Sequence, residues 1–249
     1  MSTTLNDIYS VLWVDLRSLR HQWRSVIITS IVTPFLYLLV FGYGLGQSIN
    51  VGGVSYLTFV IPGIIALTAF STSFGGAAFK LQVDRFFFKS FDEFLMSPVS
   101  FFSIVVGKSL IGVVRGLISS VAILLVGIVL SPTLIVSPLF VLVLLVSCAV
   151  FAMFGVLAAF ITPTHQGMFV FNSVVVVPMT FLCGTFLSLS GLPQAVNLAL
   201  YVLPLTPSAQ CLRAAALGQP FPWLSFALLL GYGVAFLFGS IFILQKTSV

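Results

Sequence analysis

Long apolar stretches without a charged side chain dominate the pattern of this sequence. Residues 25–79 and 116–212 contain no Lys, Arg, Asp or Glu. A helix needs about 20 apolar residues to cross the hydrocarbon core of a bilayer. The first stretch therefore holds two membrane spans and a turn, and the second stretch, with the apolar residues just before it, holds three more.

Turns divide the chain into six predicted spans, at 25–45, 56–79, 104–130, 138–161, 168–187 and 224–244. Residues 188–223 contain five prolines, so they are too broken for one span, yet they are too apolar for an ordinary loop. We expect short re-entrant or interfacial helices there, on the external side. The pattern predicts an all-α integral membrane protein with six transmembrane helices.

The basic residues predict the orientation of these spans. If the N-terminus is cytoplasmic, 8 of the 10 Lys and Arg residues fall in cytoplasmic segments or at their membrane boundary. Such an excess is typical of the cytoplasmic side of membrane proteins. Both termini are therefore expected in the cytoplasm.

Residues 1–24 form a predicted amphipathic helix, which lacks the apolar core and cleavage site of a secretory signal. A helix of this type lies in the membrane surface with its basic face toward anionic headgroups. Membrane anchoring and contact with a cytoplasmic partner both remain open for it. Its apolar stripe consists of Leu5, Ile8, Leu12, Leu16, Leu19 and Trp23, and its basic residues are Arg17, Arg20 and Arg24.

The segment 80–100 carries the only concentrated charge in the chain, together with many aromatic residues. Its helical spacing predicts a short cytoplasmic helix with Phe87, Phe91, Phe94 and Leu95 on one face, ended by Pro98. Such a face packs either against the ends of the protein's own helices or against another subunit.

Composition excludes most other classes of protein. The chain is 59% hydrophobic and only 6% charged, whereas a soluble domain has about a quarter of its residues charged. The net charge of +5 is explained by the clusters beside the spans, so nucleic-acid binding is not expected. Arg115 lies inside the third span, where an ionisable residue marks either a transport path or a structural pair.

No catalytic, metal-binding or nucleotide-binding motif is present in the sequence. Gly107-Lys108-Ser109 ends like a phosphate-binding loop but lacks the earlier glycine, because position 102 is Phe. Cys148, Cys183 and Cys211 are far apart and are expected to be buried as small apolar residues. Two GxxxG spacings, at 42–46 and 112–116, predict close helix packing.

Three stretches of the chain together resemble ABC-2 type permeases, the membrane subunits of a class of ATP-driven exporters. The first is Tyr56-Leu57-Thr58-Phe59-Val60-Ile61-Pro62-Gly63-Ile64, which is similar to the second-helix signature of the family. The second is residues 91–100 followed by Gly107-Lys108, and the third is residues 178–186 followed by Leu192-Pro193 and by residues 203–207 with Arg213.

The resemblance implies a permease that has no nucleotide site of its own. It implies two copies of this chain, as a homodimer, with two copies of a cytoplasmic ATPase that binds ATP and Mg²⁺, in a bacterial inner membrane. The N-terminal helix would be the connecting helix, and residues 25–249 the transmembrane domain. The coupling helix that docks on the ATPase would contain Phe91, Asp92, Glu93, Phe94, Leu95 and Met96.

The intramembrane candidates for the transport path are Arg115, Pro62, Gly63 and Pro178. The apolar spans favour a lipid-like, amphipathic, glycan or drug substrate over a small ion. An autonomous secondary carrier or channel is the alternative, and it needs ion-coupling residues near the membrane centre. A noncatalytic membrane scaffold is a third interpretation.

Overall fold

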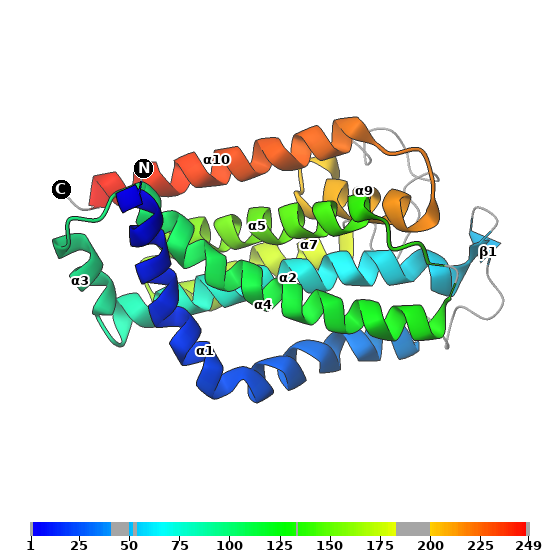
Figure 1. The fold of residues 1–249 in the computed structure, drawn as a ribbon, viewed down its shortest axis with the longest axis horizontal. Coiled ribbons are helices and arrows are strands. Elements are labelled where there is room, and N and C mark those ends of the chain that lie inside the picture. The colour runs from blue at the N-terminus through cyan, green and yellow to red at the C-terminus, as the bar shows by residue number, and fades with distance from the viewer. Residues whose placement is uncertain (1, 41–49, 52–53, 133, 183–199, 248–249) are drawn as a thin grey trace.

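The computed structural model describes residues 2–40, 50–51, 54–132, 134–182 and 200–247, and this part is almost entirely helical (Figure 1). Two short strands, β1 and β2, pair antiparallel through Asn50 opposite Ser55 and Val51 opposite Val54. The elements are α1 (Ser2–Tyr37), β1 (Asn50–Val51), β2 (Val54–Ser55), α2 (Tyr56–Phe86), α3 (Ser90–Met96), α4 (Phe101–Leu130), α5 (Pro138–Ile161), α6 (His165–Phe171), the π-helix η2 (Asn172–Val176), α7 (Val177–Leu182), α9 (Leu205–Leu217) and α10 (Trp223–Thr247).

Five helical segments of the described chain are long and apolar enough to cross a membrane. They are α2, α4, α5, the continuous run from α6 through α7, and α10. The all-α membrane fold predicted from the sequence is thereby confirmed. The sixth predicted span, residues 25–45, coincides with the second part of α1 and with positions beyond Val40 that lie outside the described residues, so the count of six remains a prediction.

Side-chain caps set where several of these helices begin. Ser55, Ser100 and Ser137 each accept a hydrogen bond from the backbone N–H three residues later, at the start of α2, α4 and α5. Such a cap satisfies one of the backbone donors that a helix start leaves open. Pro138 follows Ser137 at the first position of α5, where its missing N–H costs nothing.

Helix α2 continues seven residues beyond the predicted end at Phe79, as far as Phe86. No glycine or proline interrupts residues 80–86, and Lys80 and Asp84 pair across one turn with an Nζ–Oδ1 distance of 2.6 Å. The chain reverses only at Lys89, whose φ of 53° is left-handed. Phe87 therefore caps α2 and does not share the face of α3, contrary to the sequence prediction.

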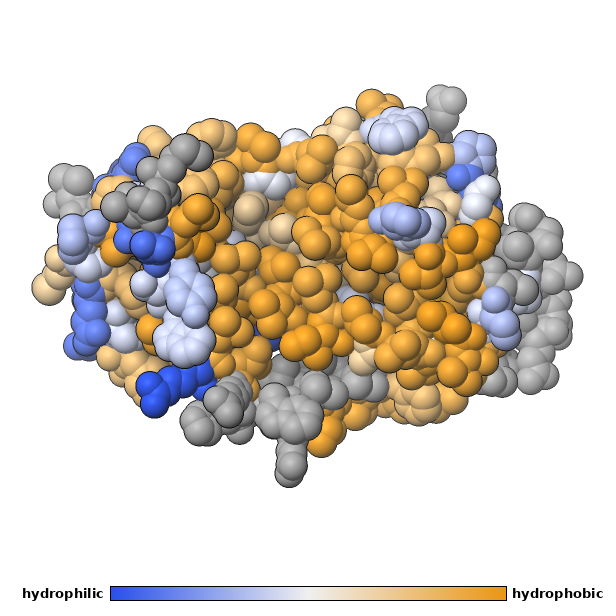
Figure 2. All heavy atoms as spheres, viewed as in Figure 1, coloured by the Kyte–Doolittle hydropathy of each residue, from blue (hydrophilic) through white to orange (hydrophobic). Residues whose placement is uncertain are grey.

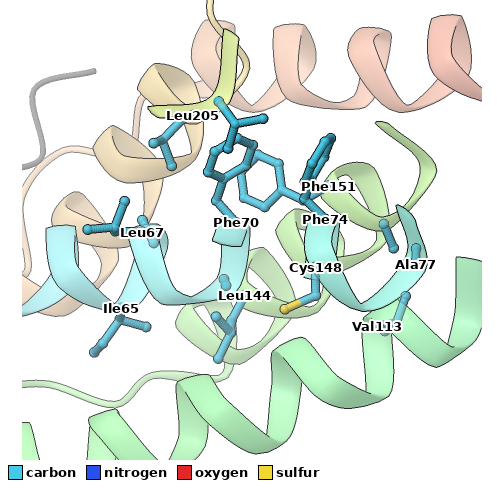
Figure 3. Close-up of a cluster of buried hydrophobic side chains, with 14 of the residues drawn as sticks. Ile65, Leu67, Phe70, Phe74, Ala77, Val113, Leu144, Cys148, Phe151 and Leu205 are labelled. Atoms are coloured by element: carbon cyan, nitrogen blue, oxygen red, sulfur yellow. The ribbon is translucent and has the colours of Figure 1, made fainter. Parts of the chain in front are cut away.

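Helix α2 forms the centre of the bundle, between α4, α5 and α9. Phe70 of α2 meets Phe151 of α5 edge to face, with 5.0 Å between ring centroids, and Leu205 of α9 and Cys148 of α5 lie in the same buried cluster (Figure 3). Gly112 of α4 lies against the carbonyl oxygen of Ser73, which explains the predicted close packing at 112–116. The other GxxxG stretch, at 42–46, lies outside the described residues.

The two ends of the bundle differ in polarity. Helix α1 changes direction midway, and its start lies at the same end of the molecule as α3 and the C-terminal end of α10 (Figure 1). Figure 2 shows hydrophilic residues gathered at that end and a broad hydrophobic band over the middle of the molecule. Exposed apolar side chains such as Leu125, Leu145 and Phe242 belong to helices of this band.

Candidate functional site

A cavity of about 440 Å³ lies beside α2 and opens at the side of the bundle. Residues of α1, α2, α4, η2 and α7 surround it, and its wall combines hydroxyl and amide groups with apolar side chains. The lining residues are Thr33, Pro34, Tyr37, Leu67, Ser71, Thr72, Gly75, Gly76, Arg115, Asn172, Val176, Val177, Thr180 and Phe181.

Arg115 is the charged residue of this cavity, and it comes from the midpoint of α4. Its side chain crosses α2 at Gly76, where a Cβ atom would lie 2.8 Å from Arg115 Cδ. Because Gly76 has no side chain, the guanidinium of Arg115 can pass α2 and reach the cavity. The buried Nε of Arg115 has no hydrogen-bond partner. An arginine without a compensating charge costs about 2.5–3.5 kcal/mol at the centre of a membrane helix on the insertion scale, and less nearer the membrane surface.

The π-helix η2 forms the opposite wall of the cavity. The backbone N–H of Val177 donates to the carbonyl of Asn172, five residues earlier, which is the π pattern. Pro178 follows directly and has no N–H for the carbonyl four residues before it, so it favours this irregular turn. π-turns inside α-helices occur frequently at functional sites, and Asn172 and Val176 of this turn both line the cavity.

The other two intramembrane candidates lie elsewhere. Pro62 and Gly63 are buried in the second turn of α2 and do not line the cavity. The structure therefore brings Arg115 together with the turn that Pro178 creates, and separates Pro62 and Gly63 from them.

Four charged residues, three of them buried, form an ion cluster that joins α1, α2 and α4 on the α3 side of the cavity. Lys108 Nζ lies 3.1 Å from Asp15 Oδ2 and 2.7 Å from Asp84 Oδ2. Lys80 Nζ lies 2.6 Å from Asp84 Oδ1 and 3.5 Å from Asp15 Oδ1. Lys108 and Asp15 are each 1% exposed, and Asp84 is 2% exposed. Buried charges persist only when they are paired in this way.

Sequence reasoning missed this ion cluster. It considered α1 only through its apolar stripe and basic residues, whereas Asp15 is buried together with Val11 and Leu19. Leu5 of that stripe is 68% exposed. The i, i+4 spacing of Lys80 and Asp84 is typical of an ion pair on a helix, and this part of the cluster was readable from the sequence.

The short helix α3 has one face packed inside and one face exposed. Phe91 is 3% exposed and meets the ring of Phe160, with 5.8 Å between centroids. The ring of Phe94 lies 4.9 Å from Lys108 Nζ, so α3 rests directly on the ion cluster. Leu95 packs partly against the core. Asp92, Glu93 and Met96 are exposed, and Phe88, just before α3, is 71% exposed.

The connecting-helix residues are only partly described. Arg17 is exposed, whereas the side chains of Arg20 and Arg24 lie outside the described part of the structure. Their proposed contact with an ATPase is therefore still a prediction.

Helix α9 lies within the region predicted to be re-entrant, and it is largely buried against α2. Arg213 donates from Nε to the Phe59 carbonyl, and its guanidinium lies 3.8 Å from the centroid of the Phe59 ring. Burial lowers the pKa of Arg213 to about 10. Burial also raises the pKa of the Cys211 thiol to about 12, so this cysteine is protonated at neutral pH. Cys183 lies outside the described residues.

Known proteins identify the family of this helical bundle. The sequence profile of the ABC-2 type transporter family matches residues 6–217, most of the chain. The protein belongs to this family and is the membrane permease subunit of an ABC transporter. Permeases of the family work with an ABC ATPase.

Two kinds of curated relatives align with most of this chain. The inner membrane transport permease YadH of Escherichia coli K12 is 28% identical over 191 residues, which is 73% of this chain and 74% of YadH. Nodulation protein J of Rhizobium leguminosarum bv. viciae is 29% identical over 210 residues, 80% of this chain and 79% of the relative. Nodulation protein J of Rhizobium meliloti is 27% identical over 204 residues, with 80% and 78% coverage.

Proposed function

We propose that this permease forms the membrane half of an ATP-driven exporter, which moves a lipid-like, amphipathic, glycan or drug substrate outward. Two copies of the chain assemble as a homodimer with two copies of a cytoplasmic ATPase, which binds ATP and Mg²⁺. The observation that carries the proposal is the exposed surface around α3, at the polar end of a bundle that belongs to the ABC-2 family.

The end that contains α3 faces the cytoplasm in this proposal, in the inner membrane that the name of YadH gives for that relative. Lys80, Arg85 and Lys89 all lie near this end, which fits the positive-inside pattern. Both termini lie at the same end (Figure 1) and are then cytoplasmic.

Movement of the ATPase reaches the bundle through α3. Closure of the ATPase dimer around ATP displaces the exposed surface of Asp92, Glu93 and Met96. Phe91 is wedged against α5 and Phe94 rests on the ion cluster, so the displacement is passed on to α1, α2 and α4. The cavity at Arg115 is bounded by the same three helices and is the proposed part of the transport path. ATP can shift the equilibrium between two arrangements of the transporter only as far as it binds one arrangement more tightly than the other.

A secondary carrier is supported less well by the described residues. Asp15 and Asp84 are both engaged by lysines at the polar end of the bundle, and no acid lines the cavity. Proton or sodium coupling would require an ionisable group that alternates between two partners near the membrane centre.

The test of the proposed function is purification from native membranes in mild detergent through a C-terminal tag, followed by an ATPase assay in lipid nanodiscs. We expect a cytoplasmic ATPase to co-purify and to show vanadate-sensitive turnover. A chain that elutes alone, although known complexes are recovered in parallel, would reject the exporter and favour gradient-driven flux.

The contact with the ATPase is expected to depend on exposed side chains at α3. Replacing Phe88 and Met96 together by Ser removes apolar surface that is 71% and 88% exposed without opening the core. Exposed apolar anchors of this kind carry much of the binding energy of an interface. We expect at least about tenfold less ATPase to co-purify with the F88S/M96S variant, measured by quantitative immunoblotting.

The matched control replaces Val202 and Leu224 by Ser, which are 67% and 75% exposed at the opposite end of the bundle. This control is expected to retain the ATPase. Full recovery of ATPase by the F88S/M96S variant would contradict the assignment of this surface. Phe91→Ala is unsuitable as a docking test because Phe91 is buried, so its truncation lowers stability as well.

A further inference from the structure

The guanidinium of Arg115 forms no ion pair among the described residues, and Asp15, which attracts it from a distance, is already paired with Lys80 and Lys108. The ion cluster of Asp15, Asp84, Lys80 and Lys108 contains two acids and two lysines, so its net charge is zero. In the described part of the chain, Arg115 forms no ion pair with a carboxylate, and its buried Nε lacks a hydrogen-bond partner. A positive group placed in this way in an apolar bundle is stabilised by an anion from outside the protein.

The hydrogen-bond donors that face the cavity suit an anion. The hydroxyls of Thr72 and Thr180 donate to carbonyls of their own helices, at 2.6 Å in each case. Arg115 brings its guanidinium and Asn172 its side-chain amide to the lining, and the π-turn places Asn172 in the wall. A guanidinium presents a planar set of N–H groups that matches phosphate and carboxylate oxygens.

Arg115 and Asn172 lie toward one end of the cavity, and the large apolar side chain of Phe181 lies toward the other. Phe79 of α2 meets His165 and Phe169 of α6, at 6.4 Å and 5.4 Å between ring centroids, so α6 starts beside the cytoplasmic end of α2 and runs back along it. Asn172 therefore lies at the level of Gly76, and Phe181 at the level of Leu67. Nine residues of helix separate the two levels in each chain segment, which is about 13 Å.

This arrangement matches a membrane amphiphile in one orientation. The end of the cavity nearer to α3 is formed by Arg115, Gly76 and Asn172. The end farther from α3 is formed by Leu67, Val177 and Phe181. Phe181 and Val177 are 54% and 43% exposed, so the apolar end opens at the side of the bundle. A volume of about 440 Å³ is in the range of small-molecule sites and accommodates a headgroup with the first part of a chain.

We propose that this cavity binds the anionic headgroup of an amphiphile from the leaflet on the α3 side, with Arg115 and Asn172 holding its phosphate or carboxylate. The apolar chain lies against Val177 and Phe181. This inference rests on the proposed transport path for its biological meaning, but binding by the cavity requires neither ATP nor the ATPase.

The test is a binding titration of the purified protein in micelles of a neutral detergent. The probes are phosphatidic acid and phosphatidylcholine with the same fluorescent acyl chain, and inorganic phosphate is the competitor. We expect phosphatidic acid to bind at least tenfold more tightly than phosphatidylcholine. Arg115→Gln is expected to remove this preference, and Arg115→Lys, which keeps the charge but not the planar donors, is expected to retain part of it. Asn172→Leu removes the second donor and weakens phosphatidic acid binding further than phosphatidylcholine binding.

Lys246→Gln is the control, because it removes one positive charge from an exposed position far from the cavity. Equal binding of phosphatidic acid by the wild type and by Arg115→Gln would overturn the proposal. Displacement of the probe by millimolar inorganic phosphate would assign the site to free phosphate and overturn the amphiphile. The ATPase is quantified in the same samples. Absence of the ATPase would reject the exporter assignment, and this result is independent of whether the cavity binds the lipid probes.

Discussion

Replacing Lys108 by Met is expected to lower the free energy of unfolding by about 3–5 kcal/mol, the range for breaking a buried ion pair from one side. Lys108 is 1% exposed and lies within 3.1 Å of carboxylate oxygens of both Asp15 and Asp84. Its removal leaves two buried carboxylates that share the single ammonium of Lys80. The measurement is the thermal unfolding midpoint of the purified protein in detergent, together with the yield of folded protein.

Two further variants separate the charge effect from simple loss of a side chain. Lys246→Met removes an exposed lysine and should leave the midpoint unchanged. Combining Lys108→Met with Asp15→Asn restores one acid to one lysine, so we expect the double variant to regain a large part of the loss. If Lys108→Met unfolds at the same temperature as Lys246→Met, the ion cluster does not stabilise the contact of α1 with the bundle.

Gly155→Ala is expected to destabilise the bundle by about 1–3 kcal/mol, although alanine is the better helix former. A Cβ at Gly155 of α5 would lie 2.5 Å from the carbonyl oxygen of Phe74, and Gly112 of α4 is equally close to the carbonyl of Ser73. These oxygens belong to the backbone of α2, so they cannot turn away as a side chain would. Helices α2 and α5 must therefore separate, and contacts such as Phe70 with Phe151 loosen.

Gly231 of α10 supplies the matched control for this substitution. It also lies inside a membrane-scale helix, but a Cβ there meets nothing within 4 Å. Gly231→Ala is expected to leave the unfolding midpoint unchanged or to raise it slightly through helix propensity. Equal midpoints for the two alanine variants, measured in the same detergent, would show that the bundle absorbs the extra methyl group and that the prediction for Gly155 is wrong.

In the proposed coupling to an ATPase, the position of α3 gives a short helix contact with a long bundle. Phe91 packs against α5, Phe94 lies over Lys108, and Met96 is exposed on the opposite side of α3. A helix held on one face moves with the elements beneath it. The ion cluster links α1, α2 and α4, and separating its charges would expose them to an apolar interior, so under this proposal the three helices move together.

Much of the fold was predictable from the sequence, because a membrane imposes simple rules. Long apolar stretches predicted four of the described membrane-scale helices, α2, α4, α5 and α10, although α4 also contains Lys108 and Arg115. The span predicted at 168–187 corresponds to α6, η2 and α7 as far as Leu182. The family resemblance rested on motifs along the chain, and the match over residues 6–217 confirms it.

The length of α2 and the composition of the α3 surface were not predictable in the same way. Charges at Lys80, Asp84 and Arg85 suggested that the span had ended, whereas pairing within the protein allows the helix to continue. Helical spacing alone gave Phe87 and Phe91 a common face, but the left-handed backbone at Lys89 separates them.

The sequence by itself determined that this chain is a helical membrane protein, because hydrophobic length and charge placement are properties of each segment alone. Its motifs determined the ABC-2 family. Only the tertiary structure decided which polar groups meet. It joined two acids and two lysines from three helices into a neutral cluster, Asp15, Asp84, Lys80 and Lys108. It also left Arg115 facing a cavity beside the π-turn at Asn172. The physical reason is that pairing and burial depend on distances between segments far apart in the chain, which periodicity within a segment does not specify.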